Sequence, residues 1–320
     1  MLAYILRRIL MAVPLLFGIS LLSFAIMKLA PGDPTVLILE PGIRPGDLEA
    51  YKEQYGLNKP LYKQYIDWIG NILQGNFGYS IIRQGVAVSD LILARLPNTL
   101  LLTVTSTFIA LVVAIPIGVI SAMKRNTMTD YSITLLSFLG LATPNFWIGL
   151  VLIMIFGVHL GWFPTGGVST IGASFSIWDR VHYLVLPAFV LATADMAGLT
   201  RYMRSSMLEV LEQDYMRTAR AKGFSQRKAV LKHAFRNALI PIITLFGLML
   251  PSFIGGSVIV ETVFAWPGIG TLFMDAAFQR DYPVIMAITL IASTLVVLGN
   301  LMADILYAVV DPRIEYEGGS

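Results

Sequence analysis

Long apolar stretches separated by polar segments dominate the pattern of this 320-residue chain. A helix needs about 20 mostly apolar residues to cross a bilayer, because each residue adds about 1.5 Å and the hydrocarbon core is about 30 Å thick. Six stretches reach that length. The pattern therefore predicts an all-α, polytopic membrane protein with spans at 9–29, 99–122, 131–157, 184–203, 238–260 and 284–307.

Composition supports this fold class and excludes several others. Apolar residues make up 56% of the chain and charged residues 13%, about half the charged share of a soluble domain. The apolar surplus also excludes a disordered chain. The 23 basic and 20 acidic residues are too sparse for a nucleic-acid surface, so we expect lipid rather than nucleic acid as the surrounding partner.

The basic residues indicate which side each segment faces. With the N-terminus inside, the inner segments together with Arg201 at the inner end of the fourth span carry fourteen Lys and Arg and the outer ones eight, six of which lie in the long segment 30–98. Because short loops rich in Lys and Arg stay in the cytoplasm, both termini are expected to be cytoplasmic. The inner segments are then 1–8, 123–130, 204–237 and 308–320, and the outer ones are 30–98, 158–183 and 261–283.

The first span is expected to be a retained anchor rather than a cleaved secretory signal. Its apolar run exceeds the 7–15 residues of a signal core, and Pro31 follows the best candidate cleavage position, Ala30.

Prolines occur in five of the six predicted spans, where each removes a backbone donor and bends its helix. Membrane helices hold more proline than soluble ones, so a structural explanation is the default at each position. At Thr143-Pro144-Asn145 polar groups flank the predicted kink, and this favours a bent helix that lines a pathway. These prolines include Pro14, Pro116, Pro144, Pro187 and Pro251.

Two outer segments show turn chemistry and amphipathic patterns. Segment 30–98 has mixed charge and predicts short helices at 49–56 and 62–73, and its aromatic residues favour a small external cap over a disordered loop. In segment 261–283 the Pro267-Gly268 pair enforces a tight turn. The aromatic residues before it suit the lipid headgroup level, which indicates a re-entrant or interfacial hairpin.

The inner segment 201–236 holds nine basic and three acidic residues. Its periodicity predicts a short helix that stops at Gly223 and a second helix at 225–237. Small residues at Thr218, Ala219 and Ala221 leave the first helix thin on one side, so it could insert into a cleft on another protein. It could equally lie on anionic lipid. Composition leaves both alternatives open.

Catalytic motifs are absent from the sequence. There is no phosphate-binding Gly-x-x-x-x-Gly-Lys-Ser/Thr loop, no Gly-x-Ser-x-Gly elbow and no cysteine, and the three histidines form no metal-binding pair. The chain is therefore expected to be no enzyme and to hold no cofactor or metal. Asp195 and Asp304 are carboxylates within predicted spans and thus functional candidates. Interfacial solvation explains Asp304, whereas Asp195 either lines a pathway or partners a neighbouring helix.

Several motifs together resemble the permease subunits of the bacterial dipeptide/oligopeptide/nickel branch of ABC importers, over essentially the whole chain. The markers are YILRR at 4–8, APGDP at 30–34, DYMRTARAKG at 214–223, WPGIG at 266–270 and DPR at 311–313. The 215–223 stretch is similar to the coupling loop of these importers. Arg217 and Thr218 replace the usual Glu-Ala, while Ala219 and Gly223 match.

The resemblance implies a type I ABC importer transmembrane domain with separate partners. A second homologous permease would complete the pathway, two ATP-binding subunits would hold ATP and Mg, and an external substrate-binding protein would deliver the cargo. Segments 30–98 and 261–283 would receive that protein. The short helix would dock into the ATPase through Tyr215, Arg217, Thr218, Ala219, Ala221, Lys222 and Gly223.

The expected activity is ATP-driven import of dipeptides or oligopeptides across the bacterial inner membrane, with nickel or glutathione as other cargoes. Residues expected to face the pathway are Thr143, Asn145, Asp195, Ser252 and Ser257. The alternative is a proton-coupled secondary transporter that uses Asp195 as the proton carrier, and a third possibility is a scaffold with no pathway.

Overall fold

The computed structural model describes residues 2–29, 58–83, 85–230, 234–249 and 258–310. Over these ranges helices are joined by turns and loops, and one isolated bridge pairs Tyr79 with Ala87. Its contacts divide it into two compact units. Unit 1 comprises Met1–Pro97 and Gly268–Val297, and unit 2 comprises Asn98–Pro267 and Leu298–Ser320.

Unit 1 contains an aromatic contact between its first two described helices, α1 (Leu2–Leu29) and α4 (Leu61–Leu73). The rings of Phe24 and Tyr65 meet edge to face at 5.5 Å, and the Tyr65 hydroxyl lies 2.7 Å from Ser20 Oγ. Helix α4 confirms the helix predicted at 62–73. The helix predicted at 49–56 lies outside the described residues.

A second core in unit 1 joins the start of α5 (Val88–Met123) to α14 (Ile269–Gln279) and α15 (Tyr282–Val310). The buried Asp281 carboxylate, at the turn between α14 and α15, accepts hydrogen bonds from Ser80 Oγ and from the Ile81 N–H. These bonds attach the segment around Tyr79 and Ala87, which contains the isolated bridge, to this core.

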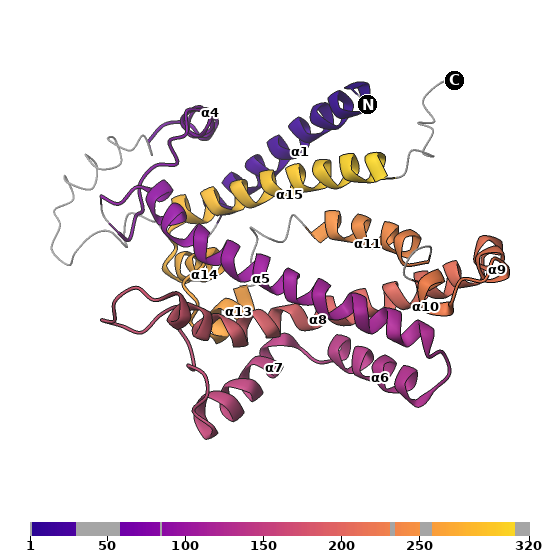
Figure 1. Ribbon diagram of the computed structural model, residues 1–320. Helices are drawn as coiled ribbons and strands as arrows, with labels where there is room; N and C mark the ends of the chain where they lie inside the picture. The colour runs from indigo at the N-terminus through magenta and orange to yellow at the C-terminus, as the bar shows by residue number, and fades with distance from the viewer. Residues whose placement is uncertain (1, 30–57, 84, 231–233, 250–257, 311–320) are drawn as a thin grey trace. The chain divides into compact units, whose positions relative to one another are not determined.

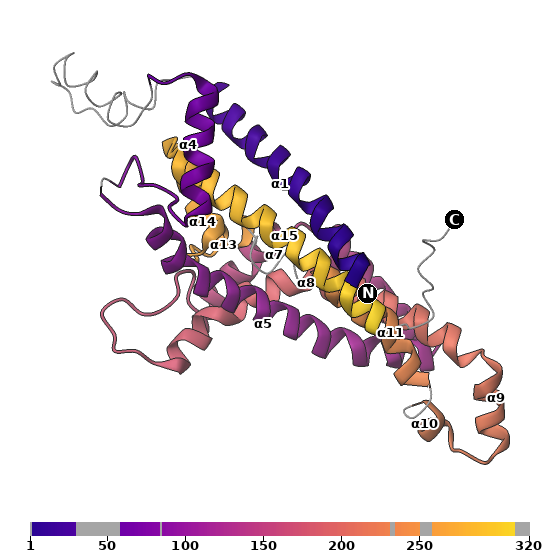
Figure 2. The same ribbon diagram turned by 90° about the horizontal axis from the view of Figure 1, so that it is seen from above.

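Unit 2 is built on two long helices, the greater part of α5 and α8 (Ile177–Leu211), which run side by side in Figures 1 and 2. Shorter helices cover them, and nearly all of the buried residues between them are alanine, leucine or methionine. The shorter helices are α6 (Met128–Ala142), α7 (Asn145–Leu152), the π-helix η1 (Ile153–His159), α9 (Asp214–Ala221), α10 (Gln226–Ala229), α11 (Phe235–Met249) and α13 (Val258–Val263).

Within the described ranges, four helices are long and apolar enough to cross a membrane: α1, α5, α8 and α15. The pair formed by α6 and the α7–η1 segment makes a fifth candidate, bent by 102° where the helix breaks. That break lies at Thr143-Pro144 and confirms the kink predicted from the proline. The structure thus supports a multi-pass helical protein, and six spans stay a prediction because 250–257 lie outside the described residues.

The long helices extend beyond the predicted spans. Helix α5 begins at Val88 rather than at residue 99, and α8 runs from Ile177 to Leu211 rather than from 184 to 203. Hydropathy finds only the apolar centre, whereas polar residues such as Asp90 and Arg95 continue the same helical turns. The second helix predicted at 225–237 begins as expected with α10 at Gln226, residues 231–233 lie outside the described ranges, and α11 continues past the predicted end to Met249.

The aromatic residues after α13 are core residues rather than headgroup anchors. Phe264 and Trp266 are 2% and 0% exposed within unit 2, so their side chains pack inside the protein rather than against lipid headgroups, and the membrane depth of this segment stays a prediction. Trp266 Nε1 donates to the Asn98 carbonyl at 3.0 Å, and the Gly167 N–H donates to the Phe264 carbonyl at 2.8 Å. Buried indole N–H groups need such an acceptor, and the α5 backbone supplies it here.

Candidate coupling site

The basic segment after α8 forms the short helix that the sequence predicts. Helix α9 spans Asp214–Ala221, and the Lys222 N–H continues its last turn by donating to the Thr218 carbonyl at 3.0 Å. Gly223 then adopts φ +81°, the left-handed conformation that ends many helices and that glycine adopts without strain. The helix and its glycine stop are therefore confirmed.

One apolar side chain anchors α9 to unit 2. Met216 is fully buried in the same core as Met207 of α8 and Val230 after α10. The Tyr215 hydroxyl accepts a hydrogen bond from Asn237 Nδ2 of α11 at 3.1 Å. Sequence reasoning missed Met216 and Asn237, although a lone methionine between polar neighbours is the signal of a buried side on a short helix.

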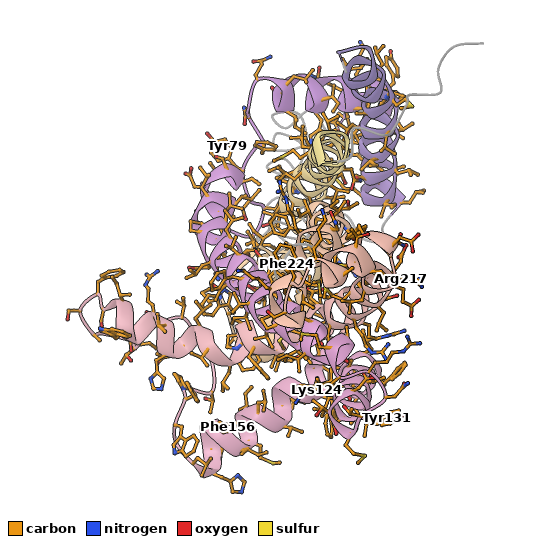
Figure 3. All side chains as sticks on the ribbon, turned by 45° about the vertical axis from the view of Figure 1, so that its right-hand side comes forward. Tyr79, Lys124, Tyr131, Phe156, Arg217 and Phe224 are labelled. Atoms are coloured by element: carbon orange, nitrogen blue, oxygen red, sulfur yellow. The ribbon has the colours of Figure 1, made fainter. Side chains whose placement is uncertain are left out.

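The remaining sides of α9 face outward. Arg217 projects from α9 in Figure 3, and its pair with Asp214, 3.5 Å apart, is 79% and 95% exposed. Exposed pairs of this kind contribute little stability, so both charges remain available to a partner. Of the other predicted coupling residues, Ala219 lies within α9, and the exposed ones are Tyr215, Thr218, Ala221, Lys222 and Gly223.

The predicted pathway residues are distributed over different elements. Thr143 and Asn145 flank the 102° break and are half-buried, and Thr143 Oγ1 donates to the Leu139 carbonyl of its own helix at 2.7 Å. Asp195 is half-buried on α8, and no hydrogen bond within the described residues joins it to that break. Ser252 and Ser257 lie outside the described ranges. Lining of a pathway by these five residues stays a prediction.

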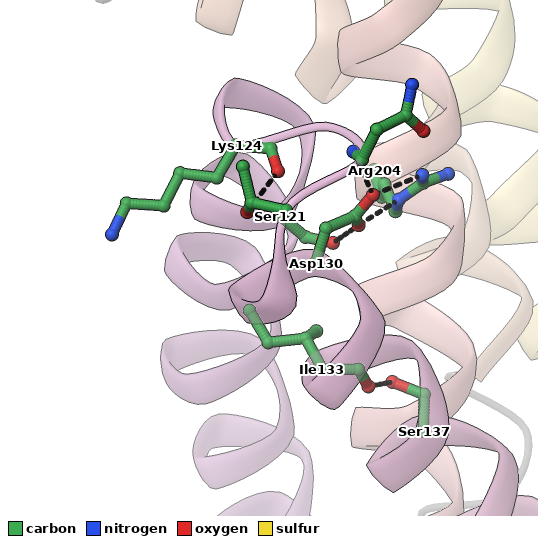
Figure 4. A network of polar contacts seen from close by, with 8 residues as sticks. Ser121, Lys124, Asp130, Ile133, Ser137 and Arg204 are labelled. Carbon is green, nitrogen blue, oxygen red and sulfur yellow. Dashed lines mark hydrogen bonds and ion pairs between the residues drawn. The ribbon is translucent and has the colours of Figure 1, made fainter.

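An ion pair with a buried carboxylate and a partly exposed guanidinium, missed by the sequence analysis, joins α8 to the first turn of α6. Arg204 donates from Nε to Asp130 Oδ1 at 2.7 Å and from Nη2 to Oδ2 at 2.8 Å, as Figure 4 shows. Ser121 Oγ of α5 donates to the same carboxylate at 2.6 Å, and the Asn126 N–H donates at 3.0 Å. Asp130 is only 2% exposed. Its two-pronged, charge-assisted contact with Arg204 and its bond with Ser121 therefore join α5, α6 and α8 at this end.

Two further contacts made by arginines lie nearby. Arg125, in the turn between α5 and α6, pairs with Glu212 after α8 at 2.9 Å, and both side chains are more than half exposed. The Arg201 guanidinium lies 4.7 Å from the centre of the Phe138 ring of α6. Arg201 of α8 therefore contacts α6, and Arg125 joins the turn before α6 to the residue that follows α8.

Glycines permit close approach of the same three helices. A Cβ at Gly118 of α5 would lie 2.7 Å from Met203 Cβ and 2.8 Å from the Thr200 carbonyl, which is too close for any side chain. A Cβ at Gly140 of α6 would lie 3.2 Å from Ala197 Cβ. Helix α8 therefore packs against α5 and α6 with almost no space between the backbones.

Metal chemistry finds no support among the described residues, where no group of three or more His, Cys, Asp or Glu could hold a metal ion.

Comparisons with known proteins assign the chain to a family. Residues 114–316 match the family described as the binding-protein-dependent transport system inner membrane component, and residues 1–103 match the N-terminal region of such membrane components. The chain belongs to this family of transport components, which are not enzymes.

Relatives match over nearly the full length. The chain is 64% identical over 316 residues to the oligopeptide transport system permease protein AppB of Bacillus subtilis (strain 168), with 99% of this chain and 100% of that protein covered. It is 42% identical over 339 residues to the di/tripeptide transport system permease protein DppB of Pseudomonas aeruginosa (strain UCBPP-PA14). It is also 42% identical over 317 residues to the glutathione transport system permease protein GsiC of Escherichia coli (strain K12). Each match covers 99% of this chain and 100% of the relative.

A solved structure supports the fold. A chain of the MetNI methionine ABC transporter in an inward-facing conformation matches with a TM-score of 0.55 and 18% identity, covering 69% of this chain and 96% of that chain. The fold is therefore that of an ABC importer transmembrane component, as the sequence resemblance implied.

Proposed function

We propose that this chain is one of two permease subunits that carry short peptides across the bacterial cytoplasmic membrane, with energy from ATP hydrolysed by partner subunits. The 64% identity to an oligopeptide permease over almost the whole chain carries this proposal. The family membership favours it over the proton-coupled alternative, because the family transports with a binding protein.

Helix α9 is the proposed docking point for an ATPase subunit. Its buried Met216 fixes it to α8 and α11, while Arg217 and Lys222 face outward and could enter a groove on a partner. A rigid short helix attached to a 35-residue helix can transmit a displacement along that helix. ATP binding by the partners would then bias the permease between inward-open and outward-open arrangements.

The proposed assembly contains this chain, a second related permease, two ATP-binding subunits and an external binding protein. The chain would cross the membrane six times with both termini in the cytoplasm. Segments 30–98 and 261–283 would contact the binding protein. The pathway would pass Thr143, Asn145, Asp195, Ser252 and Ser257.

Glutathione is the second candidate cargo, favoured by the 42% identity to a glutathione permease. It is itself a tripeptide, so the same pathway could admit both cargoes. Competition of labelled dipeptide uptake by longer peptides, glutathione and nickel separates these cargoes, and we expect short peptides to compete best.

The docking proposal is tested by adding bulk to the exposed face of α9. The substitution Ala221→Trp leaves the Met216 anchor untouched, and Gly223→Pro replaces a left-handed residue by one restricted to φ near −65°. Both should abolish copurification of the ATPase subunits and peptide uptake, at unchanged membrane abundance. The matched control Ser205→Trp adds the same bulk on an exposed position of α8 and should keep both properties.

Two results would contradict the proposed function. One is a complete wild-type assembly that takes up no peptide. The other is peptide uptake driven by a proton gradient in ATP-free vesicles that contain this chain alone, with loss on Asp195→Asn. The second result would establish the proton-coupled alternative.

A further inference from the structure

The Asp130 carboxylate collects hydrogen bonds from three separate elements. Its two oxygens accept from Ser121 of α5, from the Asn126 N–H in the turn, and twice from Arg204 of α8, while Asp130 itself lies in the first turn of α6. Asn126 adopts φ +61°, so its left-handed backbone is held in place by the same carboxylate. We call these four residues the polar clamp.

Stability alone gives a weak reason for such a cluster. Desolvating two charges is costly, and well-packed apolar residues of similar volume often hold helices together as well or better. What an apolar contact lacks is a fixed orientation. The planar guanidinium of Arg204 meets both oxygens of Asp130 at once, so it sets the rotation and register of α8 against α6.

The polar clamp lies between α9 and the break after α6. Arg204 lies seven residues, about 10 Å, before α8 ends at Leu211, and a two-residue turn then leads to α9 at Asp214. Asp130 lies thirteen residues before Thr143, about 20 Å from the break. A push on α9 that moves α8 therefore acts on the start of α6 through the clamp, in addition to the packing of Ala197 against Gly140 nearer the bend.

We propose that the polar clamp is a positioning device which makes α5, α6 and α8 move as one body when α9 is displaced, so that ATP-driven movement reaches the bend at Thr143-Pro144. The proposal rests on the docking of α9 proposed above. It assigns Asp130 and Arg204 a role in coupling ATP hydrolysis to transport, in addition to their role in holding the helices together.

The test compares transport with hydrolysis in the reconstituted complete assembly. Asp130→Asn keeps the size of the side chain and removes its charge, and Arg204→Lys keeps the charge and removes the two-pronged geometry. Both should retain membrane abundance, ATPase copurification and ATP hydrolysis, while peptides imported per ATP fall about fivefold or more, the lower end of common coupling strengths. The control Arg125→Gln removes the exposed pair beside the clamp and should leave that ratio unchanged.

A distance measurement separates coordinated movement from simple stabilisation. The chain contains no cysteine, so spin labels can be attached at Leu135→Cys on α6 and Tyr202→Cys on α8, both exposed, with cysteine-free partners. In the wild-type background we expect the same distance between labels without nucleotide and with ATP trapped. With Asp130→Asn added, we expect the distance to differ between the two states.

The proposal is overturned if both variants import as many peptides per ATP as wild type. It is overturned equally if uptake and hydrolysis fall in the same proportion, or if the wild-type label distance changes with nucleotide. A wild-type assembly without bound ATPase or without peptide uptake would instead contradict the proposed function, so the two failures are distinguishable.

Discussion

The two ends of unit 2 each contain a buried carboxylate, and the described neighbours of the two carboxylates differ. At the α9 end, Asp130 is paired with a guanidinium. At the α13 end, Glu261 is fully buried and accepts a hydrogen bond from the neutral Thr99 hydroxyl at 2.9 Å. Thr99 and Ser121 lie on the same helix, about 33 Å apart at 1.5 Å per residue, so α5 joins both arrangements.

The side chains next to the two carboxylates differ as well. Around Asp130 the neighbouring contacts are also ionic or cationic, from Arg125 and Arg201. Next to Glu261, whose backbone carbonyl accepts from the Trp266 N–H at 2.7 Å, lies an apolar core in which Trp266 packs among Leu102, Leu184 and Ala188. Ion pairs with fixed geometry keep the relative orientation of helices when one of them is displaced. A close-packed apolar core keeps helices together without setting that orientation.

The largest expected effect is loss of the ion pair. Asp130→Ala leaves the Arg204 guanidinium without its carboxylate, and we expect a loss of about 3 kcal/mol, because breaking buried pairs costs 3–5 kcal/mol and Arg204 keeps 29% of its surface exposed. Thermal unfolding of the purified assembly in detergent measures it. The control Glu212→Ala breaks the exposed pair and should change stability by about 0.5 kcal/mol or less. Equal effects would remove the distinction between the buried pair and the exposed one.

An intermediate effect is expected where α5 and α8 touch. Gly118→Ala places a methyl group 2.7 Å from Met203 Cβ and 2.8 Å from a backbone carbonyl, which forces the helices apart at a cost of about 1–3 kcal/mol. Gly198→Ala is the matched control, since its Cβ meets nothing within 4 Å, and it should be neutral or stabilising. Unfolding midpoints of the two variants provide the comparison, and coincident midpoints would contradict the close packing.

The smallest effect is expected at the α13 end. Trp266→Phe keeps an aromatic ring in the core but removes the N–H that donates to the Asn98 carbonyl, a loss of about 1 kcal/mol. Peptides imported per ATP should be unchanged in the reconstituted assembly, unlike in Asp130→Asn. A fall in that ratio as large as the one for Asp130→Asn would show that both ends contribute to coupling.

The local parts of the fold are the ones that sequence patterns predict. Apolar length predicts the long helices, Pro144 predicts the break after α6, and Gly223 predicts the stop after α9. Each depends on residues within one turn of the feature. The helix ends extend further than expected because polar residues continue a helix once its centre is formed.

Contacts between distant residues were the parts that sequence patterns could not predict. Asp130 and Arg204 are 74 positions apart, and each alone resembles an ordinary charge near the end of a span. Tryptophan is a residue type that often anchors a protein at the lipid headgroups, yet tertiary packing buries Trp266. For Met216 a local signal exists, because it is the apolar side chain of an otherwise polar helix, but its partners on α8 and α11 come from the fold.

The Met216 anchor also determines what an incoming subunit encounters. Because α9 is already folded and seated before any partner binds, association need not spend free energy on ordering a flexible peptide. Preorganisation of this kind slows dissociation more than it speeds encounter. An ATPase subunit bound to α9 could therefore remain attached through many rounds of nucleotide exchange.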